Sequence, residues 1–332
     1  MKAQAYLNGI FPRSDLALES GSRWLKGRET KENFERLLEK ETNEVIELQQ
    51  SLGFDYVIDG LLFWDDLLRP IANALGLSGH GKSSDENQVT RQIYTNTFYR
   101  KPVISGRIKK PGKEIMDTRF FGRIQTGKRK AILPSPFSIA YLSDGVHRDG
   151  NGEINKKAFV EVLLDLAKIL NEQAKALEEK SHVSFIQFNE PCIAYAKETM
   201  LFWDAINDSL NEAANGIRAV TSLHLYNGDA SKFLPELSGL CVDRIGIDAY
   251  STNMRNFIGK PFDKFLEIGV INSKNSLIEY PEMIAKYAHE IMEGIRPKGL
   301  AIVPNRPLEL VPRQIAIKKI ESMAKAAELL RD

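Results

Sequence analysis

Cysteine is nearly absent from this chain. Only Cys192 and Cys241 occur in 332 residues, far apart and outside any CxxC motif. Two isolated thiols rule out a disulfide framework and are too few for a sulfur-rich metal site. Such usage is typical of a reducing compartment, and we expect a soluble cytoplasmic protein.

Two further absences narrow the class of protein. No apolar run approaches the ~18 residues of a membrane-spanning helix, and residues 1–6 lack the apolar core of a signal peptide. The 45 basic and 44 acidic side chains leave a net charge of +1, which argues against nucleic acid or an acidic membrane as the main partner. With 43% hydrophobic and 27% charged residues, the composition indicates a globular domain rather than a disordered chain or a coiled coil.

What the chain does contain is an alternation of short apolar runs with helical periodicity. Helical spacing of apolar residues is clearest in 30–52, 155–177 and 312–330. Eight continuous apolar runs, each ending in polar residues, predict strands buried on both faces, as in a parallel sheet. The runs are 5–11, 54–58, 131–133, 183–188, 219–225, 244–247, 265–271 and 299–303.

Eight strand-then-helix units predict a (β/α)8 TIM barrel that forms one domain over residues 1–332. A doubly wound open sheet is the alternative. No glycine-rich phosphate-binding turn follows the first strand, which weakens the dinucleotide-binding version of that alternative.

Residues 76–130 do not follow the alternation, and we interpret them as an insertion between the second and third strands. A loop at 78–84 precedes aromatic, β-rich sequence at 93–99, which predicts a hairpin. Residues 100–130 hold eleven Lys and Arg against Glu114 and Asp117, a local net charge of +9 that leaves the remainder near −8. The segment is either a solvated basic hairpin or an anion site, for a multiply carboxylated ligand or an acidic partner surface.

Barrel enzymes carry their chemistry where strands end and the following loops begin. Here that ring would hold Arg13, Asp59, Ser135, Asn189, Glu190, His224, Tyr226, Asp248, Tyr250, Asn272, Ser273, Lys274, Asn305 and Arg306. This mixture of donors, acceptors and charges suits a polar, anionic small molecule. The alternative is that these residues only cap loops.

Three residues of the ring are candidates for catalysis. His224 belongs to the commonest metal-ligand type, and Asp248 stands about one strand later. Two ligands fall below the roughly three or four that zinc usually has, so we predict no metal site. Glu190 is a candidate general acid or base if buried, or else it anchors its loop by hydrogen bonds.

Several segments, in their order and spacing, together resemble the cobalamin-independent methionine synthase family, over nearly the whole chain. Ile186-Gln187-Phe188-Asn189-Glu190-Pro191 is similar to the family's IQxDEP strand, and Leu223-His224-Leu225-Tyr226 to its HxC strand. The remaining segments are Phe11-Pro12-Arg13, Leu133-Pro134-Ser135-Pro136-Phe137, Ile245-Gly246-Ile247-Asp248, Ile268-Gly269-Val270-Ile271-Asn272-Ser273-Lys274 and Val303-Pro304-Asn305-Arg306.

The resemblance implies a reaction in which zinc binds the homocysteine thiol, which then takes a methyl group from a methyltetrahydropteroyl-type folate or pterin. Family members hold the metal with His, Cys, Glu and Cys. The matching positions here are His224, Tyr226, Asp248 and Arg306, and Tyr and Arg do not replace two thiolates. Asn189 stands where the family has the aspartate that holds the homocysteine amino group.

Full-length family members consist of two related barrels, of which the N-terminal one lacks zinc and helps to bind the polyglutamate tail of the folate. The resemblance therefore implies either such an N-terminal-type half or a zinc-site-lacking paralogue. This chain would bind no cofactor of its own and would work beside a separate catalytic barrel that carries the zinc. Arg91 resembles a tail-binding lysine, and Arg13 lies in a segment that holds other tail contacts.

We thus expect His224, Asp248 and Glu190 as catalytic candidates. The expected substrate-binding residues are Arg13, Arg91, Asn189, Tyr226, Ser273, Lys274 and Arg306. Two alternatives stay open. One is a metal-independent enzyme acting on an anionic small molecule, similar to uroporphyrinogen decarboxylase. The other is a non-catalytic folate-binding or regulatory subunit.

Overall fold

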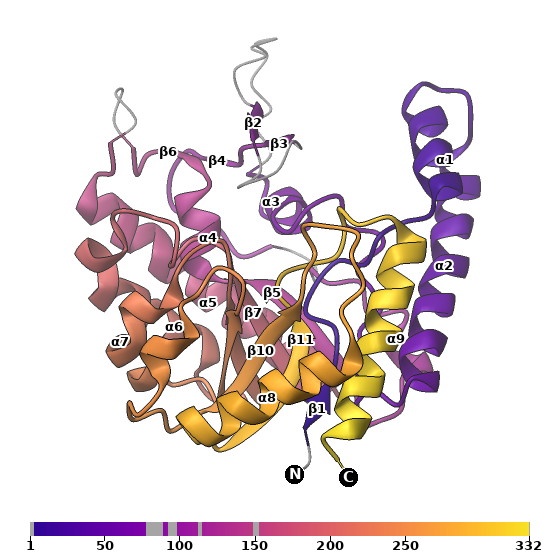
Figure 1. Ribbon diagram of the computed structural model, residues 1–332. Helices are drawn as coiled ribbons and strands as arrows, with labels where there is room; N and C mark the ends of the chain where they lie inside the picture. Colours follow the sequence, from indigo (N-terminus) through magenta and orange to yellow (C-terminus); the bar gives the residue numbers. More distant parts are fainter. Residues whose placement is uncertain (1–2, 78–88, 92–97, 112–114, 149–152, 332) are drawn as a thin grey trace.

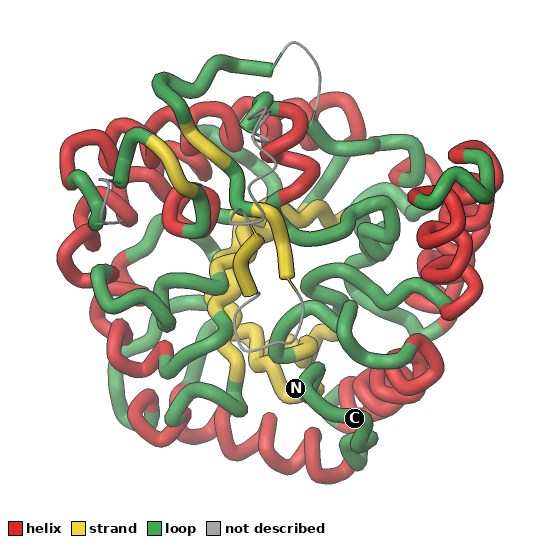
Figure 2. The backbone as a smooth tube through the Cα atoms, turned by 90° about the horizontal axis from the view of Figure 1, so that it is seen from above, coloured by secondary structure: helices red, strands yellow, loops and turns green. Residues whose placement is uncertain are grey.

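The computed structural model describes residues 3–77, 89–91, 98–111, 115–148 and 153–331, and its centre is a curled parallel sheet. Seven strands pair in the order β1-β11-β10-β9-β8-β7-β5, and every pair is parallel. The strands are β1 (Gln4–Ala5), β5 (Lys130–Pro134), β7 (Phe185–Glu190), β8 (Val220–Leu225), β9 (Arg244–Asp248), β10 (Phe265–Ile271) and β11 (Gly299–Pro304). Seen from above, helices and loops enclose the strands (Figure 2).

The segment 54–58, predicted as the second strand, connects the two edges of this sheet without becoming a regular strand. The amide of Val57 donates to Lys128 O at 2.8 Å, and the amide of Lys130 donates to Val57 O at 3.0 Å. On the other side, the amide of Asp55 donates to Ala5 O at 3.0 Å. The first strand is also shorter than the predicted 5–11, because only Gln4 and Ala5 pair with β11.

Helices cover the outside of the sheet (Figure 1). They are α1 (Asp15–Leu25), α2 (Lys31–Ser51), α3 (Arg69–Ala74), α4 (Pro136–Tyr141), α5 (Lys156–Ser181), α6 (Trp203–Ala214), α7 (Leu234–Gly239), α8 (Pro281–Ile295) and α9 (Arg313–Leu329), with short 3-10 turns at η2 (Phe121–Arg123), η3 (Thr199–Phe202), η4 (Ala230–Phe233) and η5 (Met254–Phe257). The three periodic stretches match α2, α5 and α9. Thr30 and Asn155 cap α2 and α5 by accepting backbone amide hydrogens, as their residue types favour. In the described part of the chain no helix has the length and apolar character needed to cross a membrane.

The described part of the segment 76–130 contains two short strands that pair with each other. Strand β2 (Val89–Arg91) pairs antiparallel with β3 (Phe98–Arg100), and both lie above the carboxyl ends of the barrel strands (Figure 1). Strand β4 (Val103–Ile104) pairs with β6 (Asp144–Gly145), which joins the segment to the loop after α4. The loop at 78–84 lies outside the described residues.

Three of the basic side chains of residues 100–130 contact acidic side chains of α2 and α5. Arg107 makes a two-pronged contact with Asp165 of α5, at 2.7 and 2.5 Å, and Lys110 lies 2.8 Å from Glu172 of the same helix. Arg119 contacts Glu39 of α2 at 2.8 Å. The local positive charge therefore meets negative charge elsewhere in the chain, and these contacts hold the segment against α2 and α5.

Candidate functional site

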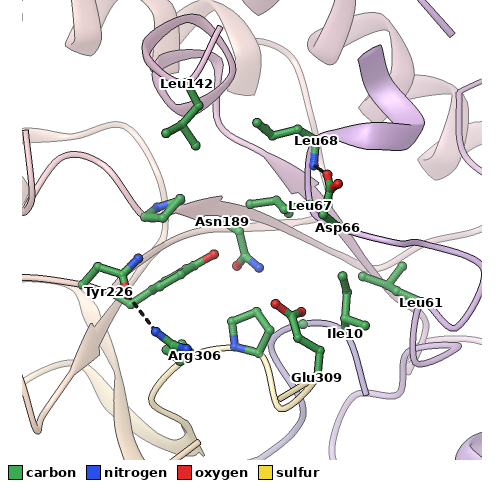
Figure 3. Close-up of a pocket in the computed structure, with 14 residues that line it drawn as sticks. Ile10, Leu61, Asp66, Leu67, Leu68, Leu142, Asn189, Tyr226, Arg306 and Glu309 are labelled. Carbon is green, nitrogen blue, oxygen red and sulfur yellow. Dashed lines mark hydrogen bonds between the residues drawn. The ribbon is translucent and has the colours of Figure 1, made fainter. Parts of the chain in front are cut away.

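The carboxyl ends of the strands surround a small pocket of about 60 Å³ (Figure 3). Its apolar wall includes Ile10, Leu61, Leu68 and Leu142. Five of its polar side chains come from the ends of β7, β8 and β11, namely Asn189, Tyr226, Asn227, Arg306 and Glu309. Asp66, which precedes α3, is a further polar residue of the lining. We call this cavity the mouth pocket.

Arg306 brings a positive charge into the mouth pocket, which Asp66 and Glu309 also line. It follows β11, is only 7% exposed, and its Nη1 donates to Asn227 Oδ1 at 3.2 Å. Tyr226 is buried beside it, and burial together with Glu309 raises the pKa of this phenol well above its ordinary value, while Arg306 acts in the opposite direction. Tyr226 is therefore a neutral hydrogen-bond donor at physiological pH, and Arg306 is a permanent cation.

Asn189 closes the floor of the mouth pocket. It is completely buried, its Nδ2 donates to Asn8 O at 3.0 Å, and its Oδ1 accepts from Gln187 Nε2 at 2.5 Å. The structure thus brings Asn189, Tyr226 and Arg306 together, three of the residues that the sequence places in the substrate site.

Asp248 and Ser273 lie deeper and connect three strand ends. Asp248 Oδ1 accepts from the Tyr250 amide at 2.9 Å and from Asn305 Nδ2 at 3.1 Å, and its Oδ2 accepts from Ser251 Oγ at 2.7 Å. Both the amide and the hydroxyl of Ser273 donate to Asn305 Oδ1 at 2.9 Å. These bonds tie the loops after β9, β10 and β11 to one another. Lys274 lies on the outer side, with its Nζ 3.4 Å from Ser251 Oγ.

Glu190 is buried under four hydrogen-bond donors. Oε1 accepts from Ser138 Oγ at 2.7 Å and from the amides of Cys192 and Ile193 at 2.6 and 2.9 Å, and Oε2 accepts from Ser135 Oγ. Burial raises the pKa of Glu190, while the hydrogen bonds act in the opposite direction. The sequence left two roles open for Glu190, and these contacts match the role of a loop anchor, because they fix the turn after β7 against α4.

His224 lies inside the barrel and is not among the residues that line the mouth pocket. It has no exposed surface; its Nε2 is 2.8 Å from Asn8 Nδ2 and 3.2 Å from Asn305 O. Its Nδ1 is 3.5 Å from Glu267 Oε2. Sequence reasoning missed Asn8 and Glu267, although a carboxylate within the apolar run 265–271 is itself a signal of a polar barrel interior.

The four positions that correspond to the family's zinc ligands do not fit a zinc ion. His224 Nε2 and both carboxylate oxygens of Asp248 already have hydrogen-bond contacts with the protein, and His224 Nδ1 faces the Glu267 carboxylate at 3.5 Å. Arg306 brings a cation where a thiolate would be needed, and neutral Tyr226 is a poor ligand. Over the ranges that the structure describes, no three His, Cys, Asp or Glu side chains are grouped so as to hold a metal.

Arg13 is not brought to the mouth pocket. Arg13 Nε donates to Leu62 O at 2.8 Å and its guanidinium lies 3.2 Å from Asp65, in a separate groove that Arg69 and Arg313 also line. The backbone of Arg91 belongs to β2, and its side chain lies outside the described residues.

A polar pocket at the carboxyl ends of a curled parallel sheet defines an α/β protein with a barrel-like active-site end. The model of the family described as cobalamin-independent synthase, catalytic domain, matches residues 7–329. The chain belongs to this family, the cobalamin-independent methionine synthases, which confirms the resemblance drawn from the sequence.

Individual relatives agree with this family. The methionine synthase of Sulfolobus acidocaldarius is 27% identical over 328 residues, which cover 98% of this chain and 91% of the relative. That of Sulfurisphaera tokodaii is 25% identical with the same coverage. Among solved structures, a B12-independent methionine synthase from Shewanella sp. W3-18-1 in complex with selenomethionine has a TM-score of 0.74 at 21% identity and covers 100% of this chain and 98% of its own. A putative vitamin-B12 independent methionine synthase from Listeria monocytogenes has a TM-score of 0.71 at 14% identity, with 99% of both chains covered.

Proposed function

We propose that this chain is a metal-free member of its family. It takes part in methyl transfer from a methyltetrahydropteroyl-type donor to homocysteine, as the partner of a separate barrel that carries the zinc. One observation carries the proposal: buried Arg306 beside Tyr226, where the family's chemistry needs thiolate ligands. Membership in the family supports methyl transfer to homocysteine as the reaction. The residues at the zinc-ligand positions, which do not suit zinc, support a separate barrel that carries the metal.

The match supports one version of this role more than the other. The family model describes the catalytic domain, and it covers almost the whole chain. The curated relatives are also scarcely longer than this chain, which spans 91% of their length. We therefore favour a paralogue of the catalytic barrel that lacks the zinc site over a chain of the N-terminal type. A closed eight-stranded barrel, completed by the segment 54–58, is part of this proposal.

The mouth pocket favours a second candidate, a metal-independent enzyme that acts on an anionic small molecule. Arg306 offers a charge-assisted hydrogen bond to a carboxylate, and Tyr226 offers a neutral donor beside it. The apolar wall formed by Ile10, Leu61 and Leu142 suits an aliphatic portion of the same molecule. In this case the chain turns over its substrate without a partner.

Three measurements on the purified chain separate these functions: its zinc content, its methyl-transfer activity alone, and its effect on a zinc-bearing barrel of the same family. We expect less than stoichiometric zinc, no methyl transfer by the chain alone, and a gain when both barrels are mixed. A partner whose homocysteine methylation is unchanged by this chain contradicts the proposal. Turnover that persists in chelator identifies the second candidate, and thermal protection by folate without any turnover identifies a regulatory subunit.

A further inference from the structure

Below the mouth pocket, a chain of buried polar side chains runs from Asn189 to Glu267. Asn189 Nδ2 and Gln187 Nε2 both donate to the backbone carbonyl of Asn8, at 3.0 and 2.9 Å. The side-chain amide of Asn8 contacts His224 Nε2 at 2.8 Å, and the other ring nitrogen faces Glu267 at 3.5 Å. All five residues are almost fully buried. The floor of the pocket is thus linked to a carboxylate inside the barrel.

The contacts of Asn8 decide which ring nitrogen of His224 carries the proton. Asn8 Nδ2 also lies 2.5 Å from the carbonyl of Pro304, which can only accept a hydrogen bond, so the amide nitrogen and not Oδ1 faces the ring. Nε2 also lies 3.2 Å from Asn305 O, but a proton on Nε2 would lie against the donor amide of Asn8, which is closer at 2.8 Å. We therefore infer that Nε2 accepts from Asn8 and holds no proton. The neutral ring then carries its proton on Nδ1, on the side of Glu267.

Glu267 has the charge needed to hold that proton. Burial alone would raise the pKa of Glu267, but the hydrogen bond from His224 and the charges of Lys130 and Arg244 keep it below its ordinary value. The Tyr6 hydroxyl donates to Glu267 Oε1 at 3.0 Å, and the other carboxylate oxygen, Oε2, faces the imidazole of His224. Neither Nδ1 nor Oε2 hydrogen-bonds to any other described residue, and the two atoms face each other at 3.5 Å.

A glycine makes the space for this contact. Gly246 of β9 lies in register with His224 of β8 on one side and with Glu267 of β10 on the other. A Cβ at position 246 would lie 2.0 Å from His224 Nδ1 and 2.8 Å from Glu267 Oε2. The two side chains therefore meet over the one strand between them, at a position where any larger residue would push them apart.

We propose that His224 and Glu267 form a positioning pair for the mouth pocket. Glu267 orients the imidazole, the imidazole fixes Asn8, and Asn8 fixes Asn189 together with Gly9 and Ile10, which line the pocket. His224 acts through Asn8 and does not itself touch the ligand. The part of this proposal that concerns ligand affinity rests on the proposed function, because it takes homocysteine as the ligand, with Asn189 at the position where the family holds its amino group.

The test compares the wild type with Glu267→Gln, which keeps the shape of the side chain and removes its charge. The control is Asp165→Asn, the same kind of change at a buried carboxylate of α5 that contacts Arg107 and not the pocket. Nitrogen-15 NMR of histidine-labelled protein reports the tautomer and the hydrogen bond at Nδ1. Calorimetry reports the Kd for L-homocysteine.

We expect the Nδ1–H tautomer for His224 in the wild type and a changed Nδ1 shift in Glu267→Gln. We also expect homocysteine affinity to fall roughly tenfold in Glu267→Gln, the size of effect typical for the loss of one hydrogen bond, and to be unchanged in Asp165→Asn. An Nε2–H tautomer in the wild type overturns the proposal, as does an unchanged Kd in Glu267→Gln or an equal loss in the control. A wild type that does not bind homocysteine refutes the proposed ligand, and in that case the NMR result alone decides on the pair.

Discussion

The ammonium group of Lys130 lies 4.0 Å from the centre of the Tyr6 ring, inside the base of the barrel. It donates to Leu7 O at 2.8 Å and also faces the ring of Phe185. Arg244 stacks on the same aromatic group from another strand, at 4.9 Å from Phe185. A cation is therefore held under the site by rings and a carbonyl rather than by water.

This burial makes stability depend on pH. Burial lowers the pKa of Lys130 from 10.5 to about 7, with Glu267 and Arg244 acting in opposite directions. Between these values the unfolded chain binds the proton that the folded chain has released, so the free energy of unfolding rises with pH, by at most about 1.4 kcal/mol per pH unit. We expect urea unfolding to show this rise from pH 7 to 9, and Lys130→Met to lack it. An equal slope in both proteins would contradict the assignment.

Asp59 gives a dependence of the opposite sign at lower pH. Burial raises the pKa of Asp59 from 3.8 to about 6, although the amide of Leu61 donates to its Oδ1. Between these values the folded state holds a proton that the unfolded state has released, so stability falls as pH rises. Asp59→Asn keeps an acceptor for the amide and should remove the fall. Chemical unfolding between pH 4 and 6.5 measures the stability of the wild type and of the variant. The same pH dependence in both proteins would contradict the assignment to Asp59.

Gly246→Ala is expected to destabilise the barrel by roughly 1–3 kcal/mol, the usual cost of overpacking a core. The added methyl group would meet His224 and Glu267, neither of which has free space to move into. Gly239→Ala is the matched control, because a Cβ there meets nothing within 4 Å. Urea midpoints for the two variants provide the measurement. Equal midpoints would show that the barrel interior accommodates the added methyl group without loss of stability, contrary to the prediction.

Arg306→Gln should weaken the binding of a small carboxylate ligand about tenfold or more, because a charge-assisted hydrogen bond contributes roughly 1.5–3 kcal/mol. Arg13→Gln is the control, since Arg13 lies in a different groove and contacts Asp65. Kd values for L-homocysteine and for a polyglutamylated folate distinguish the two arginines. If Arg13 holds the folate tail, its variant loses folate affinity and keeps homocysteine affinity. A loss of homocysteine binding only in Arg13→Gln would place the anion site elsewhere.

Much of the fold was predictable from local sequence. Six of the eight apolar runs coincide with strands β5 and β7 to β11, because a strand buried on both faces must be apolar along its whole length. The helical spacing around Phe159 and Leu170 likewise predicted α5. The segment 54–58 did not become a regular strand, since its pairing depends on two edges that come together only in three dimensions.

The polar residues at the strand ends were also visible in the sequence, and so was the loss of the zinc ligands, because each residue type carries its own donor chemistry. Only the tertiary structure separated Arg306, which lines the mouth pocket, from Arg13, which faces Asp65 in another groove. Only the tertiary structure shows that the His224 side chain faces Glu267 across Gly246. Both outcomes depend on the register between neighbouring strands, which brings together residues far apart in the chain and leaves no trace in the spacing of either one.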